Sequence, residues 1–298
     1  MILIQDPKNA PTGHKVIAVG SFDGVHLGHQ ALLARARRRA QEAGLPLLVY
    51  TFDPPTKALT KGVPILSTLS EKAKLLEVAG ADVVLAVPFD EAFARRTKEA
   101  FLEELRGLEP RLLVVGEDFR FGRGRSGGLE DLAQVAPVEA VPLVCHQGAP
   151  VKSTRIRDAL LSGDVELAQA LLGRPYAVEG VVVRGQGLGR QLGFPTANLA
   201  LPAMKALPQG VFAVEVEHKG HLQPGVAHAG PRPTLEDARP RLEVHLFEGN
   251  GELYGETLRV RFLKRLRAPR RFPDLAALKA QIARDVEAAR AFFSQQGA

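Results

Sequence analysis

The sequence predicts an α/β fold in two domains, a parallel sheet with helices followed by a small antiparallel β-barrel. Three observations predict it. The chain has 298 residues, which is more than one hydrophobic core usually organises. Its first half alternates short apolar runs with segments of helical periodicity, whereas its second half has strand-like runs separated by turn residues. We place the boundary near residue 174, which gives domains of residues 1–174 and 175–298.

In the first half we expect strands separated by helices. The expected strands are Lys15–Gly20, Leu47–Phe52, Asp82–Val87 and Arg111–Val115. The expected helices are Leu27–Ala43, a segment with apolar residues from Ala73 to Val78 that follows a capping box at Thr68 and Glu71, and Thr97–Arg106. This alternation predicts a parallel sheet with helices on both faces. Such sheets bind ligands at the carboxyl ends of their strands, so we expect the chemistry just after Val19, Val49 and Val115.

The pattern changes near Gly173. The strand-like runs beyond it are Ala177–Val183, Val211–Glu217, Arg241–Phe247 and Leu258–Phe262, with turn residues such as Gly249-Asn-Gly251 between them. Short strands and frequent turns favour a small antiparallel barrel. From Leu275 to Phe293, apolar residues recur at steps of three and four, which predicts an amphipathic helix that packs on the barrel.

The composition is that of an ordinary globular protein, with 45% hydrophobic and 24% charged residues. A single cysteine, Cys145, excludes an intrachain disulfide, and its apolar neighbours predict a buried strand. We find no export signal and no apolar stretch long enough to span a membrane, so we expect a cytoplasmic protein without a membrane partner. The net charge of +6 fits nucleic acid or small polyanions such as ATP, and does not choose between them.

The first motif follows the first strand and opens the first helix. It reads Gly20-Ser-Phe22-Asp23-Gly24-Val-His26-Leu-Gly28-His29. Glycines let the backbone approach a ligand closely, and a helix N-terminus offers N–H groups and partial positive charge. Two imidazoles aimed at that place suit nucleotidyl transfer, in which charge builds on the α-phosphate. Histidines that merely decorate a helix start are the plain alternative, and a zinc site lacks further ligands nearby.

A second segment supports an anion site. Ser153 or Thr154 can cap a helix whose first turn carries Arg155 and Arg157. Cations at a helix N-terminus interact unfavourably with the helix dipole. A bound anion would offset that interaction, and a triphosphate would be such an anion. An ordinary N-cap with two solvated arginines is the alternative.

The third motif is a glycine-rich loop in the second half. It reads Gly185-Gln-Gly187-Leu-Gly189-Arg190 and continues to Thr196 and Asn198. It lacks the lysine of a P-loop and a following helical period. Two oxygen-bearing side chains beside such a loop could cover phosphates and hold Mg²⁺, although a barrel turn is a serious alternative. Glu243 lies on the polar face of an expected strand, and only the neighbouring phosphate loop makes it a candidate general base.

Taken together, these segments resemble the bifunctional riboflavin kinase/FMN adenylyltransferase family of prokaryotes. The resemblance covers nearly the whole chain. Its motifs are Gly20–His29, Thr51-Phe-Asp-Pro54, residues 115–122 from Val115 to Gly122, Ser153–Arg157, residues 193–198 from Gly193 to Asn198, Arg232-Pro-Thr234, and Glu243 with Tyr254-Gly255.

The resemblance implies a nucleotidyltransferase domain and a six-stranded kinase barrel. It implies phosphorylation of riboflavin to FMN, then adenylyl transfer from ATP to FMN, which gives FAD and pyrophosphate. His26 and His29 would contact the ATP phosphates, and Thr196 with Asn198 would hold Mg²⁺. Glu243 would accept the proton of the ribityl 5′-hydroxyl. Asp53, Asp118 and Phe119 fall in the matching motifs and would line the flavin or nucleotide pocket.

Two segments depart from the family pattern. His228 stands where asparagine is usual, with an unusual Pro231 beside Arg232, and Lys152 replaces a small residue before Ser153. Contacts of a flap over the kinase substrates are therefore expected to differ.

Three rival functions remain open from the residues alone. One is adenylyl transfer to another acceptor, such as pantetheine phosphate or nicotinamide mononucleotide, which the second domain argues against. Another is nucleic-acid binding through the basic stretch Arg259–Arg271, which lacks interleaved aromatic residues for base stacking. The third is a flavin-binding protein without catalysis, which would leave the two histidines unexplained. We expect small-molecule partners and no nucleic acid, and the sequence does not predict the oligomeric state.

Overall fold

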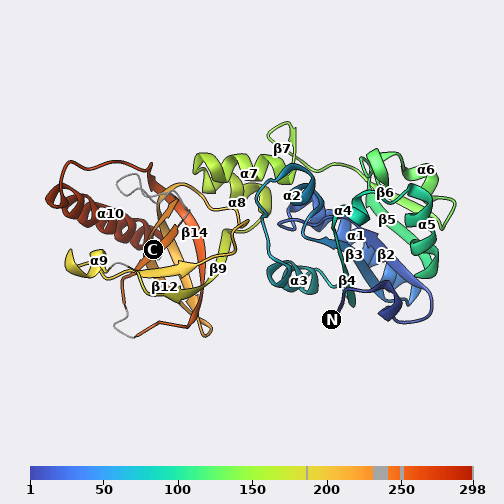
Figure 1. The fold of residues 1–298 in the computed structure, drawn as a ribbon, viewed down its shortest axis with the longest axis horizontal. Helices are drawn as coiled ribbons and strands as arrows, with labels where there is room; N and C mark the ends of the chain where they lie inside the picture. The colour runs from blue at the N-terminus through green and yellow to red at the C-terminus, as the bar shows by residue number, and fades with distance from the viewer. Residues whose placement is uncertain (186, 231–240, 249–251, 297–298) are drawn as a thin grey trace. The chain divides into compact units, whose positions relative to one another are not determined.

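The computed structural model describes residues 1–185, 187–230, 241–248 and 252–296. The chain divides into two compact units, Met1–Ser153 and Thr154–Ala298. Each unit contains one of the two predicted folds (Figure 1). Among the helices of the described residues, none is both long and apolar enough to cross a membrane.

The first unit is built on a parallel six-stranded sheet. Its strands, in spatial order, are β1 (Ile2–Ile4), β4 (Val83–Pro88), β3 (Leu47–Asp53), β2 (Lys15–Val19), β5 (Pro110–Gly116) and β6 (Val138–Val141). All neighbouring pairs are parallel. The strand order reverses between β2 and β5, and open α/β sheets bind ligands at such a switch point.

Helices connect these strands. They are η1 (Pro7–Asn9), α1 (Leu27–Ala43), α2 (Thr56–Lys61), α3 (Leu69–Val78), α4 (Glu91–Ala94), α5 (Lys98–Gly107), η2 (Arg123–Arg125) and α6 (Leu129–Leu132). Thr68 caps α3 in a capping box with Glu71, as the spacing predicts, and Thr97 caps α5. The unit ends in a small ribbon of β7 (Cys145–His146) and β8 (Ala149–Pro150).

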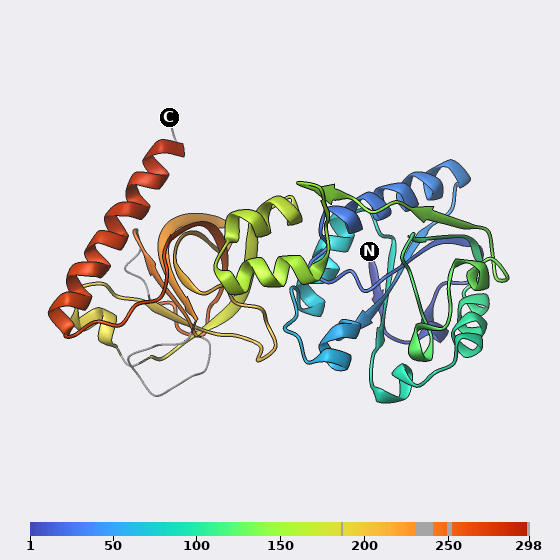
Figure 2. The same ribbon diagram turned by 90° about the horizontal axis from the view of Figure 1, so that it is seen from above.

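Both faces of the sheet are buried, as predicted for a parallel sheet. Ile17 and Tyr50 face α5 on one side, in a core with Phe101 and Leu105. Alternate strand residues face the other way and pack against α1 and Leu76 of α3. Figure 2 shows α1 and α5 on opposite sides of the strands.

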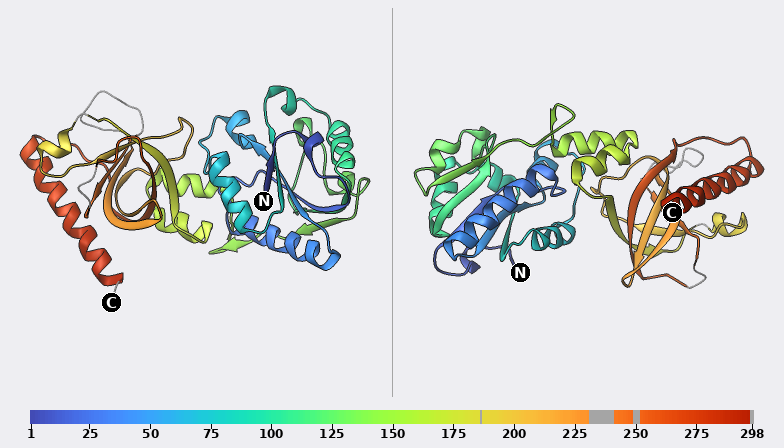
Figure 3. Two further views of the ribbon diagram at one scale, coloured as in Figure 1. Left: turned by 90° about the horizontal axis from the view of Figure 1, so that it is seen from below. Right: turned by 180° about the vertical axis from the view of Figure 1, so that it is seen from behind.

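The second unit is a closed antiparallel barrel. Its strands, in spatial order, are β10 (Ala197–Ala200), β13 (Arg241–Leu246), β12 (His221–Gly230), β11 (Gly210–His218), β14 (Thr257–Arg267) and β9 (Tyr176–Val183). Its helices are α7 (Ser153–Ser162), α8 (Val165–Leu172), the single turn α9 (Leu188–Gln191) and α10 (Leu275–Gln296). α8 packs on β9 and β14, and α10 packs on β11, β12 and β14 (Figure 3).

The predicted fold class is therefore confirmed, with several local corrections. Short edge strands β1 and β6 and the barrel strands β10 and β12 were not anticipated, and the glycine-rich loop contains the helical turn α9. The expected turn at residues 249–251 and the motif at residues 231–234 lie outside the described residues.

Two predictions about burial and capping are wrong. Cys145 is exposed, because β6 ends at Val141 and Cys145 pairs only with Pro150 in the two-stranded ribbon. Ser153 does not precede its helix as a cap. It is the first residue of α7, and its hydroxyl donates a hydrogen bond to the carbonyl oxygen of Asp23 instead.

Candidate active sites

The first candidate site lies at the carboxyl end of β2, where the sequence predicts it. The segment from Gly20 to His29 leaves this strand beside the switch point and enters α1. Gly28 is closely packed, since a Cβ there would lie 3.2 Å from the His26 ring and 3.6 Å from the carbonyl oxygen of Val151. The loop therefore lies against the segment that leads to Ser153.

His26 and His29 are held together at the start of α1. Their rings stack with centroids 3.6 Å apart, and Phe22 packs edge-on against His29 at 5.2 Å. His26 is buried and caps the helix, because its Nδ1 accepts the backbone N–H of His29 at 3.3 Å. With Nδ1 acting as an acceptor, the proton of the neutral ring lies on Nε2, which makes Nε2 the donor. The arrangement suits an electrostatic role toward a phosphate.

The same loop has an unusual backbone. Phe22 and Val25 have positive φ angles of 47° and 39°, a region that bulky and β-branched residues rarely occupy. Such conformations persist only where the surroundings hold them, and they are common at functional sites. Asp23 is one of those supports. Its buried carboxylate accepts the backbone N–H groups of Leu66 and Ser67 at 2.9 and 3.1 Å.

Lys72 is a further charged group at this site that the sequence analysis missed. It is fully buried in α3, and its ammonium donates to the carbonyl oxygen of Phe52 at 2.6 Å. It also lies 3.4 Å from the carbonyl oxygen of Ser21 and from the hydroxyl of Thr51. The spacing held a signal for this burial, because Lys72 stands four residues before Leu76 and so lies on the apolar face of the helix. Val78, which was expected on that face, is exposed.

The other predicted pocket residues lie at the ends of neighbouring strands. Asp53 is the last residue of β3, and Asp118 and Phe119 follow β5. Asp118 forms an exposed ion pair with Lys152 at 2.9 Å, so the departure at position 152 supplies a partner for this carboxylate. Phe119 stacks on Phe121 with ring centroids 5.9 Å apart. Contact of these side chains with a flavin or nucleotide stays a prediction.

The arginines of the second predicted segment lie in the other compact unit. Thr154, Arg155 and Arg157 occupy the first turns of α7, and Arg157 is buried. Their binding to a triphosphate stays a prediction.

The second candidate site lies in the barrel, where the glycine loop meets β10 and β13. Asn198 is paired directly across from Glu243 in the antiparallel ladder. A Cβ on Gly185 would lie 2.3 Å from the amide nitrogen of Asn198, and a Cβ on Gly189 would lie 2.9 Å from the hydroxyl of Thr196. The loop can therefore pack on both side chains only because these positions are glycine. Gly187 has a positive φ of 72° and begins the turn that carries Arg190.

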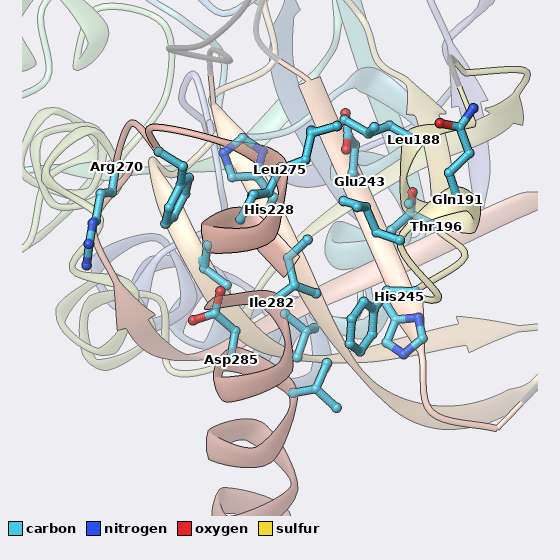
Figure 4. Close-up of a pocket in the computed structure, with 18 of the residues that line it drawn as sticks. Leu188, Gln191, Thr196, His228, Glu243, His245, Arg270, Leu275, Ile282 and Asp285 are labelled. Carbon is cyan, nitrogen blue, oxygen red and sulfur yellow. The ribbon is translucent and has the colours of Figure 1, made fainter. Parts of the chain in front are cut away.

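A cavity of about 570 Å³ opens beside these residues. Thr196, Gln191 and Glu243 lie along one side of it, and Arg270 and Asp285 lie along the other (Figure 4). Its apolar wall comes from Val211, Val226 and three α10 residues, Leu275, Leu278 and Ile282. His228, the departure from the family pattern, also lines the cavity and is paired with Glu243 from the β12 side. An apolar cavity with a few convergent polar groups is typical of a small-molecule site.

The barrel site also has the chemistry for a hard cation. Thr196 and Asn198 offer oxygen atoms, which Mg²⁺ prefers, and the phosphates of a bound nucleotide would complete its coordination shell. Within the described residues, no group of three or more His, Cys, Asp or Glu side chains is placed to hold a metal.

Comparison with known proteins gives separate matches for the sheet part and the barrel part of the chain. The family model for FAD synthetase matches residues 8–155, and the model for riboflavin kinase matches residues 172–293. The bifunctional riboflavin kinase/FMN adenylyltransferase of Escherichia coli K12 is 41% identical over 97% of this chain and 96% of its own length. The Bacillus subtilis protein of the same description is 38% identical over 94% and 92%.

A solved structure supports the fold over the same extent. A protein from Streptococcus pneumoniae, described as a macrolide-efflux protein, superposes with a TM-score of 0.86 at 32% identity. The match covers 97% of this chain and 98% of that one. The efflux description concerns the Streptococcus protein, and the comparison shows a shared fold.

The two folds and their sites define a transferase of flavin-cofactor synthesis. The chain belongs to the bifunctional riboflavin kinase/FMN adenylyltransferase family. It carries the two activities of that family, and so makes FMN and FAD.

Proposed function

We propose that the barrel unit phosphorylates riboflavin and that the sheet unit adenylylates FMN, each at the site described above. The observation that carries the first assignment is the direct pairing of Asn198 with Glu243 under the glycine loop. The observation that carries the second is the stacked His26–His29 pair at a helix N-terminus beside the switch point.

In the kinase step, Glu243 accepts the proton of the ribityl 5′-hydroxyl as that oxygen attacks the γ-phosphorus of ATP, and ADP leaves with the bridging oxygen. Thr196 and Asn198 would hold Mg²⁺, and that ion would supply positive charge to offset the charge of the phosphates. The apolar wall of the cavity covers the flavin ring. The cross-strand pairing of Asn198 with Glu243 supports this arrangement, in which the proposed base lies next to a proposed metal ligand.

In the adenylyl step, the FMN phosphate attacks the α-phosphorus of ATP, and pyrophosphate leaves. His26 and His29 stabilise the charge that builds on the α-phosphate and on the bridging oxygen. Arg155 and Arg157 bind the departing phosphates. Asp53, Asp118 and Phe119 bound the flavin or nucleotide pocket.

We propose small-molecule partners and no nucleic acid, in the cytoplasm. Part of the basic stretch Arg259–Arg271 that favoured nucleic acid is paired with carboxylates of the barrel. Arg261 pairs with Glu217 at 2.9 Å and lies 3.9 Å from Glu215, and Arg259 pairs with Glu217 at 3.3 Å. An arginine that already forms an ion pair attracts a phosphate less strongly. We therefore expect at most weak and salt-sensitive binding of RNA.

The proposal is tested by incubating the protein with riboflavin, Mg²⁺ and ATP and separating the flavins over time. FMN that appears first and converts to FAD, with release of ADP and pyrophosphate, is the expected result. FMN as the final product would contradict the assignment of the sheet unit. Absence of turnover with riboflavin and with added FMN would overturn both assignments.

Glu243→Gln tests the general base. Glutamine keeps the size of the side chain and cannot accept the proton, so riboflavin phosphorylation should slow by about 10²–10⁴-fold. Adenylylation of added FMN should stay at the wild-type rate, because this variant does not alter the sheet unit. A parallel fall in both rates would contradict the two-site assignment.

A further inference from the structure

Lys72 is a buried charge to which the two reactions assign no role. It lies in α3, outside every motif that the sequence analysis singled out, yet its ammonium ends at the carboxyl edge of the sheet. Three oxygen atoms surround that ammonium, from Ser21 after β2 and from Thr51 and Phe52 at the end of β3. It therefore joins the two strand ends on which the first site is built.

The partners of Lys72 are matched to its protonated form. An ammonium has three N–H donors, and three acceptor oxygens face it. The hydroxyl of Thr51 also donates to the carbonyl oxygen of Ser21 at 3.1 Å, so the ammonium and the hydroxyl hold the same carbonyl. A neutral amine would have only two donors and would turn a lone pair toward one of these oxygens.

Ser21 is the residue directly before the strained part of the loop. Phe22 and Val25, with their positive φ angles, follow it, and His26 comes next. The same stretch before α3 supports the loop a second time, because Ser67 accepts the N–H of Gly24 at 3.0 Å and its own N–H binds Asp23. Residues 66–72 thus hold the loop from its start at Ser21 to Gly24.

We propose that Lys72 is a positioning residue for adenylyl transfer: its ammonium holds the loop after β2 in the strained conformation that presents His26 and His29 to the phosphates. The inference rests on the proposed adenylyl site of the sheet unit. Lys72 acts through Ser21, Thr51 and Phe52 and touches no reacting atom.

The protonation of Lys72 offers a readout that a packing role would not produce. Burial lowers the pKa of Lys72 to about 8, and the carboxylates of Asp23 and Asp53 partly oppose that shift. These two carboxylates are the charged groups that act on it from the loop after β2 and from the end of β3. Above pH 8 the ammonium is progressively lost, and the loop loses a donor.

The test compares Lys72→Met with Lys15→Met in the full chain. Both lysines are buried in the sheet unit and bind carbonyl oxygens, but Lys15 binds those of Gly13 and Leu108 at the amino end of β2, away from the site. Lys72→Met should lower kcat for FAD formation from added FMN by about 10–100-fold, because a displaced catalytic group loses rate even where binding survives. KM for ATP should change less than threefold, and Lys15→Met should match the wild type.

Two further measurements complete the test. The wild-type adenylyl rate should fall between pH 7.5 and pH 9 relative to the kinase rate of the same sample, and Lys72→Met should lack that fall. A wild-type kcat in Lys72→Met, an equal loss in Lys15→Met, or a wild-type rate ratio that stays constant with pH would each overturn the proposal. If the wild type itself makes no FAD from FMN, the proposed adenylyl function fails instead, so the two failures are distinguishable.

Discussion

At the scale of the residue, His26 has two separable functions. Its Nδ1 caps α1, and its Nε2 is the donor that faces away from that cap. Asparagine is an equally good N-cap residue but lacks the ring, so it preserves the first function and removes the second.

His26→Asn should therefore lower kcat for FAD formation by about 10²–10³-fold, the cost typical of losing one preorganised donor, while thermal stability is preserved. His26→Ala should show the same loss of rate and an added loss of about 1 kcal/mol in stability, because the cap is gone. Calorimetry and flavin chromatography on both variants check this. An active His26→Asn enzyme would leave His26 with the cap alone.

Lys72 also affects the stability of the sheet unit, with a sign that follows from its pKa. The pKa is about 8 in the folded protein and about 10.5 in the unfolded chain, so between these values the unfolded chain binds more protons. The free energy of unfolding should therefore rise by about 3 kcal/mol from this group between pH 8 and pH 10.5.

Lys72→Met removes that contribution. Because methionine does not titrate, the stability of the variant relative to the wild type should fall by about 3 kcal/mol between pH 8 and pH 10.5. Urea unfolding of both proteins at several pH values gives the difference directly. A constant difference across this range would mean that Lys72 does not titrate there.

At the scale of the element, a bidentate ion pair links α10 to the barrel in addition to their apolar packing. Arg267 of β14 makes a bidentate contact with Asp285 of α10, with distances of 2.8 to 3.0 Å, and Gln281 adds a bond to the same carboxylate. Asp285 is buried, and both charges line the cavity of the kinase site. The pair therefore fixes the helix that supplies the apolar wall of that cavity.

Asp285→Ala leaves Arg267 without its carboxylate in a largely buried place, which costs about 3 kcal/mol in barrel stability. KM for riboflavin should rise, and adenylylation of added FMN should be unchanged. Lys264→Ala is the matched control within the barrel unit, because the Lys264–Glu166 pair is exposed and contributes no more than about 0.5 kcal/mol. Equal effects of the two substitutions on the melting of the barrel would contradict the role given to Asp285.

At the scale of the whole molecule, the two units divide after Ser153, the first residue of α7, whereas the sequence places the boundary of the two domains near residue 174. Residues 154–174 lie between these two boundaries and include α8, whose apolar face is buried against the barrel strands. Val165, Leu171 and Leu172 are fully buried, and Glu166 pairs with Lys264 of β14 at 2.9 Å.

A fragment of residues 154–298 should therefore fold and phosphorylate riboflavin. A fragment of residues 175–298 lacks the buried face of α8 and should be less stable by roughly 5 kcal/mol, from three large apolar side chains. Circular dichroism melts and kinase assays of both fragments check the prediction. Equal stability would place α7 and α8 outside the kinase unit.

Much of the fold was predictable because its signals are local. The helix Leu27–Ala43 has the predicted bounds, and the capping box at Thr68 forms as its spacing requires. Short strands such as Ile2–Ile4 were missed, since three residues have no measurable period and become strands only by pairing with β4.

The sequence by itself determined the two fold types, the loop after the first strand and the glycine loop, because periodicity, caps and glycines act over a few neighbouring residues. Tertiary structure decided the remainder. It set Asn198 opposite Glu243, gave the Ser153 hydroxyl a partner 130 residues away, exposed Cys145, and carried the Lys72 ammonium to the strand ends. Each of these contacts joins segments that are distant in the sequence, and a local pattern does not say which distant segment will become its neighbour.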